Sequence, residues 1–524
     1  MLREVRVENG VVRGIPAADP RITAFKGIPY AAPPVGDLRW CAPQPAEDWE
    51  GVRDCARFGP IAIQETPGLE SSAFYSREWH VDPEIPMSED CLQLNIWTPA
   101  KSADEKLPVM VWIFGGGLYN GYPAEMEFDG ERLARRGVIL VSINYRLNAF
   151  GFLAHPEITK ESPEFPTNFG HLDQRFALQW IKRNIGAFGG DPENILVFGQ
   201  SAGGGSTFMQ VISPLNKGLF QKAIHHSSGG QLPPALDSFT LEDAEKMGEQ
   251  FFADLGVSTL AEARALPAEK IVELGKLRKY NFGTVVGDAF MPDYPTSMIT
   301  DGKRNDVAIM TGNTGNEFQM KVQGDTMDEI RNYAAMMFGD RAQEYLDIIT
   351  RDTDDIEQIK KNGQWNRFAI GNYIWLDTNI AQGKPSIYYY YFNPDIPGDD
   401  AGSFHSSDLW FAFETLAKCW RPFQGKHYDL ARKMCNYWTN FAKNGDPNGP
   451  DNDGTPMPYW RPTTAGDVHP MYFGDDAAMD ESPRTELDNF LVDFYSKKLA
   501  KKERITFGRA VGRRSDGSLI MKMG

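Results

Sequence analysis

One serine stands where a nucleophile could act. Ser201 lies in the segment "ILVFGQSAGGGS", residues 195 to 206, directly after a short apolar run. Residues 199 to 203 fit the pattern G-x-S-x-G, in which glycines on both sides let the backbone turn sharply and expose the serine hydroxyl for attack on a carbonyl carbon. Serine is also a favoured helix cap, so these five residues alone leave both interpretations open. A nucleophilic serine further needs a base, an acid and a site for the oxyanion.

A general base must accept the serine proton, and the chain has eight histidines. His405, in "AGSFHSSDLWFAF", follows the strand-like segment "SIYYYYF" and a loop rich in Gly and Asp. Where the nucleophile lies in this motif, the acid and then the base come later in the chain, so His405 is the candidate base. His225 and His226 are expected to have a structural role beside the site. The remaining five are interpreted as ordinary polar residues: His80, His155, His171, His427 and His469.

The acid that orients the base should lie between Ser201 and His405 in the chain. Glu317 follows the apolar run and glycine-containing turn of "VAIMTGNTGNEF", where a carboxylate can be buried against an imidazole N–H. Taken alone, Glu317 would more often be a solvated loop charge, and its place in the series makes it the candidate acid. Asp288 is the competitor because it also follows an apolar run. Two further aspartates precede their strand and are expected at the opposite sheet edge: Asp301 and Asp306.

Three consecutive glycines could form the oxyanion site. Gly115, Gly116 and Gly117 follow the apolar run of "VWIFGGGLYNG", upstream of the serine. Without Cβ atoms, their backbone N–H groups can converge on a developing negative charge. The N–H of Ala202 would add another donor. A plain flexible turn is the alternative interpretation.

Apolar strands and amphipathic helices alternate around these residues. Strands are expected at "LPVMVWIF", "GVILVSINY" and "NILVFGQ", with a helix at "LDQRFALQWIKRNIGAF" before the last. This alternation predicts an α/β fold with a large, mostly parallel central sheet and helices on both faces. The first hundred residues carry short alternating segments and many turn residues, which predict an antiparallel N-terminal edge.

The domain organisation follows from what the chain lacks. We find no internal repeat, low-complexity segment or Ser/Gly-rich linker, so we expect a single catalytic domain over residues 1–524. Two helical insertions, near residues 238–282 and 320–385, are candidate cap or regulatory segments. The locally basic tail from Ala500 onward is expected to be a solvated end.

The composition of the chain argues against several classes of binding partner. The formal net charge of -17 argues against a nucleic acid or an anionic membrane surface as partner. No apolar run approaches the roughly 20 residues that span a bilayer. The N-terminus enters a strand pattern at once, without the features of a signal peptide, and the five cysteines are irregularly spaced. We therefore expect a cytoplasmic protein with reduced thiols, either a monomer or a small homo-oligomer.

Eight blocks follow one another along the chain: "FKGIPYAAPPVGDLRW", "SEDCLQLNIWTP", "VWIFGGGLYNG", "NYRLNAFGFL", "LDQRFALQWIKRNIGAFGGDPENILVFGQSAGGGS", "GNTGNEF", "FHSSDLWFAF" and "YWTNFAKNGDPNG". Together they resemble the type-B carboxylesterase family, the cholinesterase-like branch of the α/β-hydrolases. The resemblance covers most of the chain and implies an α/β-hydrolase fold. It also implies Ser201 as nucleophile, His405 as base and Glu317 as acid, with oxyanion donors at Gly116, Gly117 and Ala202.

The sequence departs from the family pattern at several points. Gln200 stands where the family usually has Glu, which removes a negative charge and should weaken any preference for cationic esters. Cys91 matches one end of a disulfide common in secreted members, but the expected partner region reads "GPIAIQ", without cysteine. This supports an unbridged form. Four residues are expected beside the site: Leu118, Gln200, Ser227 and Asp408.

These observations predict a serine carboxylic-ester hydrolase that acts through an acyl-enzyme on small to medium esters. No metal or organic cofactor is expected. A feruloyl or other aromatic-ester specificity is the alternative within the class. A non-catalytic, cholinesterase-like adhesion module is the alternative from a different class, although such relatives lose the nucleophile.

Overall fold

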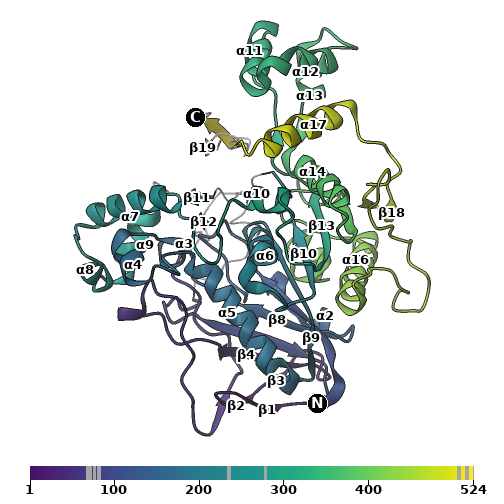
Figure 1. Ribbon diagram of the computed structural model, residues 1–524. Helices are drawn as coiled ribbons and strands as arrows, with labels where there is room; N and C mark the ends of the chain where they lie inside the picture. Colours follow the sequence, from purple (N-terminus) through teal and green to yellow (C-terminus); the bar gives the residue numbers. More distant parts are fainter. Residues whose placement is uncertain are drawn as a thin grey trace.

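An 11-stranded sheet forms the centre of the protein (Figure 1). We describe it from a computed structural model that covers residues 1–65, 74, 78, 84–232, 238–276, 280–503, 505, 509–513 and 519–522. The strand order is β18-β17-β16-β13-β10-β9-β7-β8-β6-β4-β3. Seven neighbouring strands pair in parallel: β7 (Leu107–Ile113), β8 (Ile139–Ile143), β9 (Gly190–Gln200), β10 (Lys222–His226), β13 (Ala308–Thr314), β16 (Ile387–Phe392) and β17 (Met471–Phe473). The predicted mostly parallel sheet is confirmed.

Both edges of the sheet are antiparallel. At the N-terminal edge, β6 (Gln93–Thr98) pairs antiparallel with β8, followed by β4 (Thr23–Pro29) and β3 (Ile15–Pro16). This agrees with the predicted N-terminal edge. The other edge, where β18 (Ala477–Met479) pairs antiparallel with β17, was not predicted. Its strands have three residues each, too few to show a clear alternation in the sequence.

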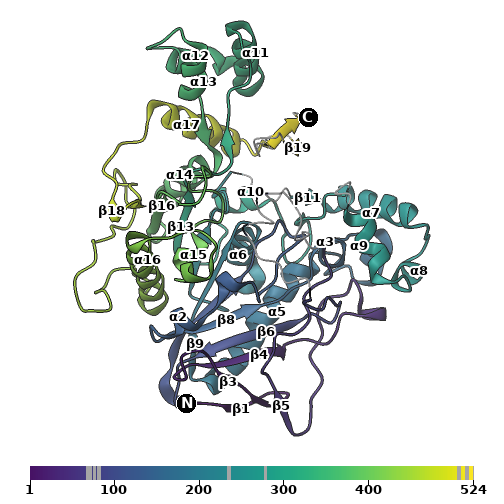
Figure 2. The same cartoon turned by 180° about the vertical axis from the view of Figure 1, so that it is seen from behind.

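Helices cover both faces of the sheet (Figures 1 and 2). Successive side chains of a strand point to opposite faces, and His225 and His226 at the end of β10 show this directly. The His225 ring contacts Phe208 of α6 (Ala202–Ile212) and Trp375 of α14 (Arg367–Ala381). The His226 ring contacts Trp438 of α16 (Gly425–Asn444). Helices α6 and α14 therefore lie on one face, and α16 lies on the other.

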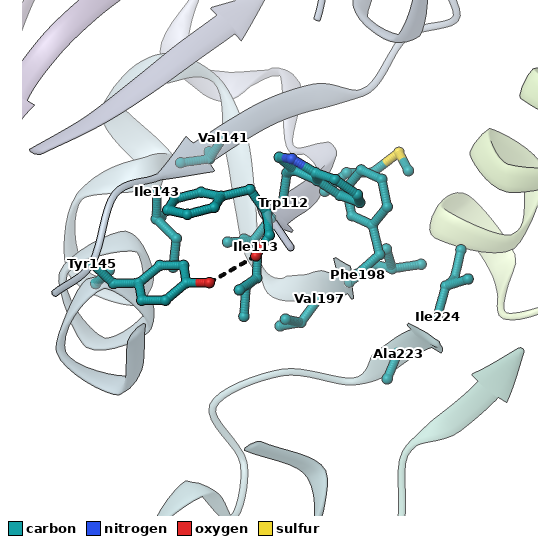
Figure 3. Packing of buried hydrophobic residues seen from close by; sticks show 14 of the residues in the cluster. Trp112, Ile113, Val141, Ile143, Tyr145, Val197, Phe198, Ala223 and Ile224 are labelled. Carbon is teal, nitrogen blue, oxygen red and sulfur yellow. Dashed lines mark hydrogen bonds between the residues drawn. The ribbon is translucent and has the colours of Figure 1, made fainter. Parts of the chain in front are cut away.

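The core between these layers is apolar and aromatic (Figure 3). Trp112 of β7 is fully buried, and its ring lies 4.8 Å from that of Phe198 on β9. Beside it, the Tyr145 hydroxyl donates to the carbonyl oxygen of Phe114 at 2.7 Å. This bond satisfies a buried carbonyl at the point where β7 ends and the glycine-rich loop begins.

The two predicted insertions are helical. The first holds α7 (Leu241–Leu255), α8 (Leu260–Arg264) and α9 (Ala268–Lys276), and the second holds α11 (Met327–Phe338), α12 (Ala342–Ile349), α13 (Ile356–Asn362) and α14. The second insertion packs with α17 (Glu486–Ala500) around a hydrophobic cluster of its own, in which the rings of Phe338 and Phe490 lie 5.3 Å apart. A role of either insertion as a cap, and the assignment of one domain, stay predictions.

The chain ends in a short hairpin of β19 (Arg509–Arg513) and β20 (Leu519–Lys522). The rest of the basic tail beyond residue 505 lies outside the described residues, as does His80. Among the residues described, no helix has the length and apolar composition needed to cross a bilayer.

Candidate active site

Ser201 occupies a strained turn between β9 and α6. Its φ of 56° and ψ of -124° are rare for a residue with a side chain. The flanking residues Gly199 and Gly203 must be glycines, because backbone carbonyl oxygens lie where a Cβ atom would be. A Cβ atom at Gly203 would lie 2.1 Å from the carbonyl oxygen of Ile113, and one at Gly199 would lie 2.4 Å from the carbonyl oxygen of Gly203. The turn therefore presses against the end of β7 and presents the serine at the carboxyl edge of the sheet.

The structure brings together the three side chains singled out in the sequence. His405 Nε2 lies 2.8 Å from Ser201 Oγ. On the other side of the ring, Nδ1–H donates to Oε2 of Glu317. The side chain of Glu317 is fully buried, and its Oε1 accepts from the backbone N–H of Thr314 at 2.8 Å. An ionised carboxylate only accepts hydrogen bonds, so Nδ1 carries the imidazole proton and Nε2 can accept from the serine.

Asp288, the competing acid, lies in another contact network. Its carboxyl accepts from Asn168 Nδ2 at 2.9 Å and from the N–H of Met291 at 2.7 Å. Burial raises the pKa of Asp288 to about 6, although these hydrogen bonds oppose the shift. The described contacts therefore pair His405 with Glu317.

The glycine-rich loop lies against the serine turn. Gly116 and Gly117 have φ angles of 104° and 69°, and a Cβ atom at Gly116 would lie 2.1 Å from the carbonyl oxygen of Asn120. A Cβ atom at Gly115 would lie 3.2 Å from Cβ of Ser201. Ala202 begins α6, where the first N–H groups have no acceptor within the helix. The loop and the helix thus meet at the serine from two sides.

The four residues expected beside the site are buried. Gln200 Nε2 lies 3.4 Å from His405 Nε2. The carbonyl of Leu118 accepts from the N–H of Asn148 at 2.7 Å, which holds the glycine-rich loop. The N–H of Ser227 donates to the carbonyl of Gly312 at 2.8 Å, at the carboxyl ends of β10 and β13.

Asp408 belongs to a buried network that the sequence did not predict. Its Oδ2 accepts from His226 Nδ1 at 2.8 Å and from the Tyr390 hydroxyl at 3.0 Å. Trp438 Nε1 donates to His226 Nε2 at 2.8 Å. An indole N–H can only donate, so Nε2 of His226 is unprotonated and the ring is neutral. The carbonyl of His226 accepts from the N–H of Ser201 at 3.0 Å, which agrees with the structural role expected for this histidine.

The sequence also did not predict the aromatic pair of Phe318 and Phe368 beside His405. Phe318 follows Glu317 with a φ of 44°, and its ring meets the His405 ring edge-on at 4.9 Å. It stacks on Phe368 at 4.5 Å. A positive φ at a phenylalanine leaves no signal in the sequence, because contacts elsewhere in the fold impose it.

Two carboxyls lie behind the glycine-rich loop. Glu125 and Glu127 are both buried and lie close enough for each to act on the pKa of the other. Burial raises the pKa of Glu125 to about 7 and the pKa of Glu127 well above its usual range. Burial, with a smaller contribution from Glu125, raises the pKa of Tyr145, whose hydroxyl donates to the carbonyl oxygen of Phe114 before the three glycines.

A mostly parallel sheet with a strained serine at a strand end, joined through histidine to a buried carboxylate, defines an α/β-hydrolase of the serine hydrolase type. The chain belongs to the carboxylesterase family, whose model matches residues 2–491. It is therefore a carboxylesterase, a serine hydrolase of carboxylic esters.

The chain is also similar to individual esterases, in sequence and in structure. The chain is 31% identical over 496 residues to an acetylcholinesterase of Bungarus fasciatus, which covers 85% of this chain and 79% of that protein. It is 31% identical over 465 residues to a fumonisin B1 esterase of Sphingopyxis macrogoltabida, with 84% and 82% covered. A solved carboxylesterase of Geobacillus stearothermophilus superposes with a TM-score of 0.74 at 28% identity, covering 92% of this chain and 98% of that one. These comparisons favour neither aromatic-ester specificity nor a non-catalytic adhesion module.

Replacing the acid tests the pairing of Glu317 with His405. Glu317→Gln should lower kcat by roughly 10³ to 10⁴, because an amide favours the wrong imidazole tautomer and cannot stabilise the imidazolium. Asp288→Asn is the matched control and should keep near-wild-type kcat, since Asp288 has other partners. Steady-state hydrolysis of p-nitrophenyl acetate measures both variants. Near-wild-type kcat in Glu317→Gln, with loss of kcat in Asp288→Asn, would show that the acid is Asp288.

The buried carboxyl pair predicts a pH dependence of stability. The folded-state pKa of Glu125 is raised from 4.5 to about 7, so its stabilisation is fully present below pH 4.5 and is lost as the pH rises through about 7. Glu127→Gln supplies an amide donor for the Glu125 carboxylate, so the free energy of unfolding should fall less over this range than in the wild type. Urea unfolding between pH 4.5 and 8 measures it. Glu193→Gln, at an exposed carboxylate, is the control and should follow the wild type. Parallel curves for wild type and Glu127→Gln would show that Glu127 does not influence the titration of Glu125.

Proposed function

We propose that Ser201, His405 and Glu317 carry out ester hydrolysis in this protein as nucleophile, general base and orienting acid. The observation that carries the proposal is the continuous series from Ser201 Oγ through both ring nitrogens of His405 to the buried Glu317 carboxylate. In this arrangement His405 takes the serine proton as the hydroxyl attacks. Glu317 holds the imidazole in the required tautomer and stabilises the imidazolium that forms.

The N–H groups of Gly116, Gly117 and Ala202 are the proposed oxyanion donors. The positive φ of both glycines and the contact of the loop with Ser201 support this role. A Cβ atom at Gly117 would meet nothing within 4 Å, so there is space beside this residue for a substrate group. Donors already aimed at the developing charge lower the barrier without reorganising during the reaction.

The reaction proceeds in two acyl transfers. Ser201 Oγ bonds to the ester carbonyl carbon, the tetrahedral intermediate collapses, and the alcohol leaves with the proton from His405. Water then gives a proton to His405 as it attacks the acyl-enzyme. The second tetrahedral intermediate collapses to the carboxylic acid, and His405 returns the proton to Ser201 Oγ. Each step uses side chains and backbone amides of the chain, so the proposal needs no metal or organic cofactor.

Neutral carboxylic esters of small to medium size are the proposed substrates. Gln200 supports this, because it places an amide rather than a carboxylate 3.4 Å from His405 Nε2. An adjacent carboxylate would attract a cationic alcohol group, whereas an amide adds no net charge. The half-buried ring of Phe318, which meets the imidazole of His405 edge-on at 4.9 Å, provides an apolar surface for the hydrocarbon part of the ester.

Removing the serine hydroxyl tests the proposed roles. Ser201→Ala should lower kcat/KM for p-nitrophenyl acetate by a factor on the order of 10⁴ to 10⁶ while the protein stays folded. The control is Ser206→Ala, which removes a buried hydroxyl from the same helix and should keep the activity. Circular dichroism confirms folding of both variants. Undiminished turnover in Ser201→Ala would overturn the assignment.

A further inference from the structure

A cavity lies far from the serine. Its volume is about 620 Å³, within the range of small-molecule sites. It lies between α2 (Glu131–Ala134) with the turn that follows, and the C-terminal half of α16 with the loop after it. Both views show α2 beside this end of α16 (Figures 1 and 2).

The position of the cavity separates it from the catalytic site. Asn194 Nδ2, near the start of β9, donates to the carbonyl oxygen of Lys443, whose side chain lines the cavity. Ser201 follows the other end of β9. Seven residues of strand, at about 3.3 Å each, separate the two places by roughly 23 Å. The cavity therefore lies at the amino-terminal ends of the parallel strands, whereas Ser201 lies at their carboxyl-terminal ends.

The carboxylates that line the cavity already have cationic partners. Arg136 Nη2 lies 2.5 Å from Glu414 Oε2, and its Nε donates to Asn436 Oδ1 at 2.6 Å. Asp451 is paired with Arg432. These pairs leave no carboxylate of the lining to neutralise a further cation.

Two cations of the lining have no such partner. Arg132 and Lys443 both line the cavity, and within the described ranges neither has a carboxylate at ion-pair distance. Their side chains lie near one another, because both act on the Cys435 thiol. Burial raises the pKa of this thiol and Glu414 adds to the rise, while Arg136, Arg132 and Lys443 act in the other direction. Burial and the nearby Arg136 lower the pKa of Lys443. A cavity with surplus positive charge is unexpected in a chain of net charge -17.

We propose that this cavity binds a small molecule through a phosphate dianion held by Arg132 and Lys443, the two lining cations without a carboxylate partner among the described residues. Guanidinium groups donate two parallel hydrogen bonds to phosphate oxygens, and the ammonium adds a point charge. An anion here would relieve the repulsion between the neighbouring cations. Inorganic phosphate and a phosphate monoester share this chemistry, and the volume leaves space for the organic part of a monoester.

Isothermal titration of the full-length protein tests the proposal. Inorganic phosphate and glycerol 3-phosphate should each bind with saturation at a stoichiometry of one, at an ionic strength matched with sodium chloride. Lys443→Met and Arg132→Met should each raise Kd roughly tenfold or more, the loss expected for one charge-assisted hydrogen bond. Lys426→Met removes an exposed lysine of the same helix, paired with Asp475, and should leave Kd unchanged. All three variants should keep wild-type esterase activity without added phosphate, which shows that they are folded.

The outcomes separate the possibilities. Tighter binding of glycerol 3-phosphate than of phosphate assigns the rest of the cavity to an organic group, and the reverse order assigns a free phosphate ion. Equal binding of citrate and phosphate would overturn the phosphate chemistry. No saturable heat with either phosphate probe, or equal Kd values in Lys443→Met, Arg132→Met and Lys426→Met, would overturn the site.

Discussion

The strained backbone at Ser201 is the constraint on which the rest of the site depends. A residue with this φ and ψ costs about 1 to 3 kcal/mol, so the surrounding fold must hold it in place. Contacts of Gly203 with the end of β7, and the hydrogen bond from the Ser201 N–H to the carbonyl of His226, do so from two neighbouring strands. The parallel register of β7, β9 and β10 therefore sets the position of the hydroxyl.

A buried polar network supports this turn from behind. His226 is the last residue of β10, and its neutral ring joins Asp408 to Trp438. Asp408 lies three residues after His405, so the network connects the loop that carries the base with the strand that holds the serine. Oδ2 of the buried Asp408 accepts from both His226 and Tyr390. Because a buried carboxylate that loses a hydrogen-bond partner destabilises the fold, these contacts specify the geometry of the network. Strand pairing and the side-chain hydrogen bonds of this network thus both help to position Ser201 and His405.

Much of the site could be predicted because its residues follow strands in chain order. Ser201, Glu317 and His405 each come after an apolar segment, and the parallel sheet brings those segment ends to one edge. The partners of Asp408 could not be predicted, because His226 and Trp438 are brought to it by packing between distant segments. Likewise, the hydrophobic cluster that joins α11 and α12 to α17 depends on contacts more than 100 residues apart. The antiparallel β17 and β18 edge is too short to leave a pattern. The roles assigned to the catalytic residues stay predictions.

The central claim is that Ser201 becomes acylated during turnover. Acid quenching of the protein within milliseconds of mixing with p-nitrophenyl acetate, followed by intact mass measurement and peptide mapping, tests it directly. The account predicts one acetyl group per chain, located on Ser201, that disappears as the substrate is exhausted. Turnover with no acetyl group on Ser201, or with the acetyl group on another residue, would contradict it.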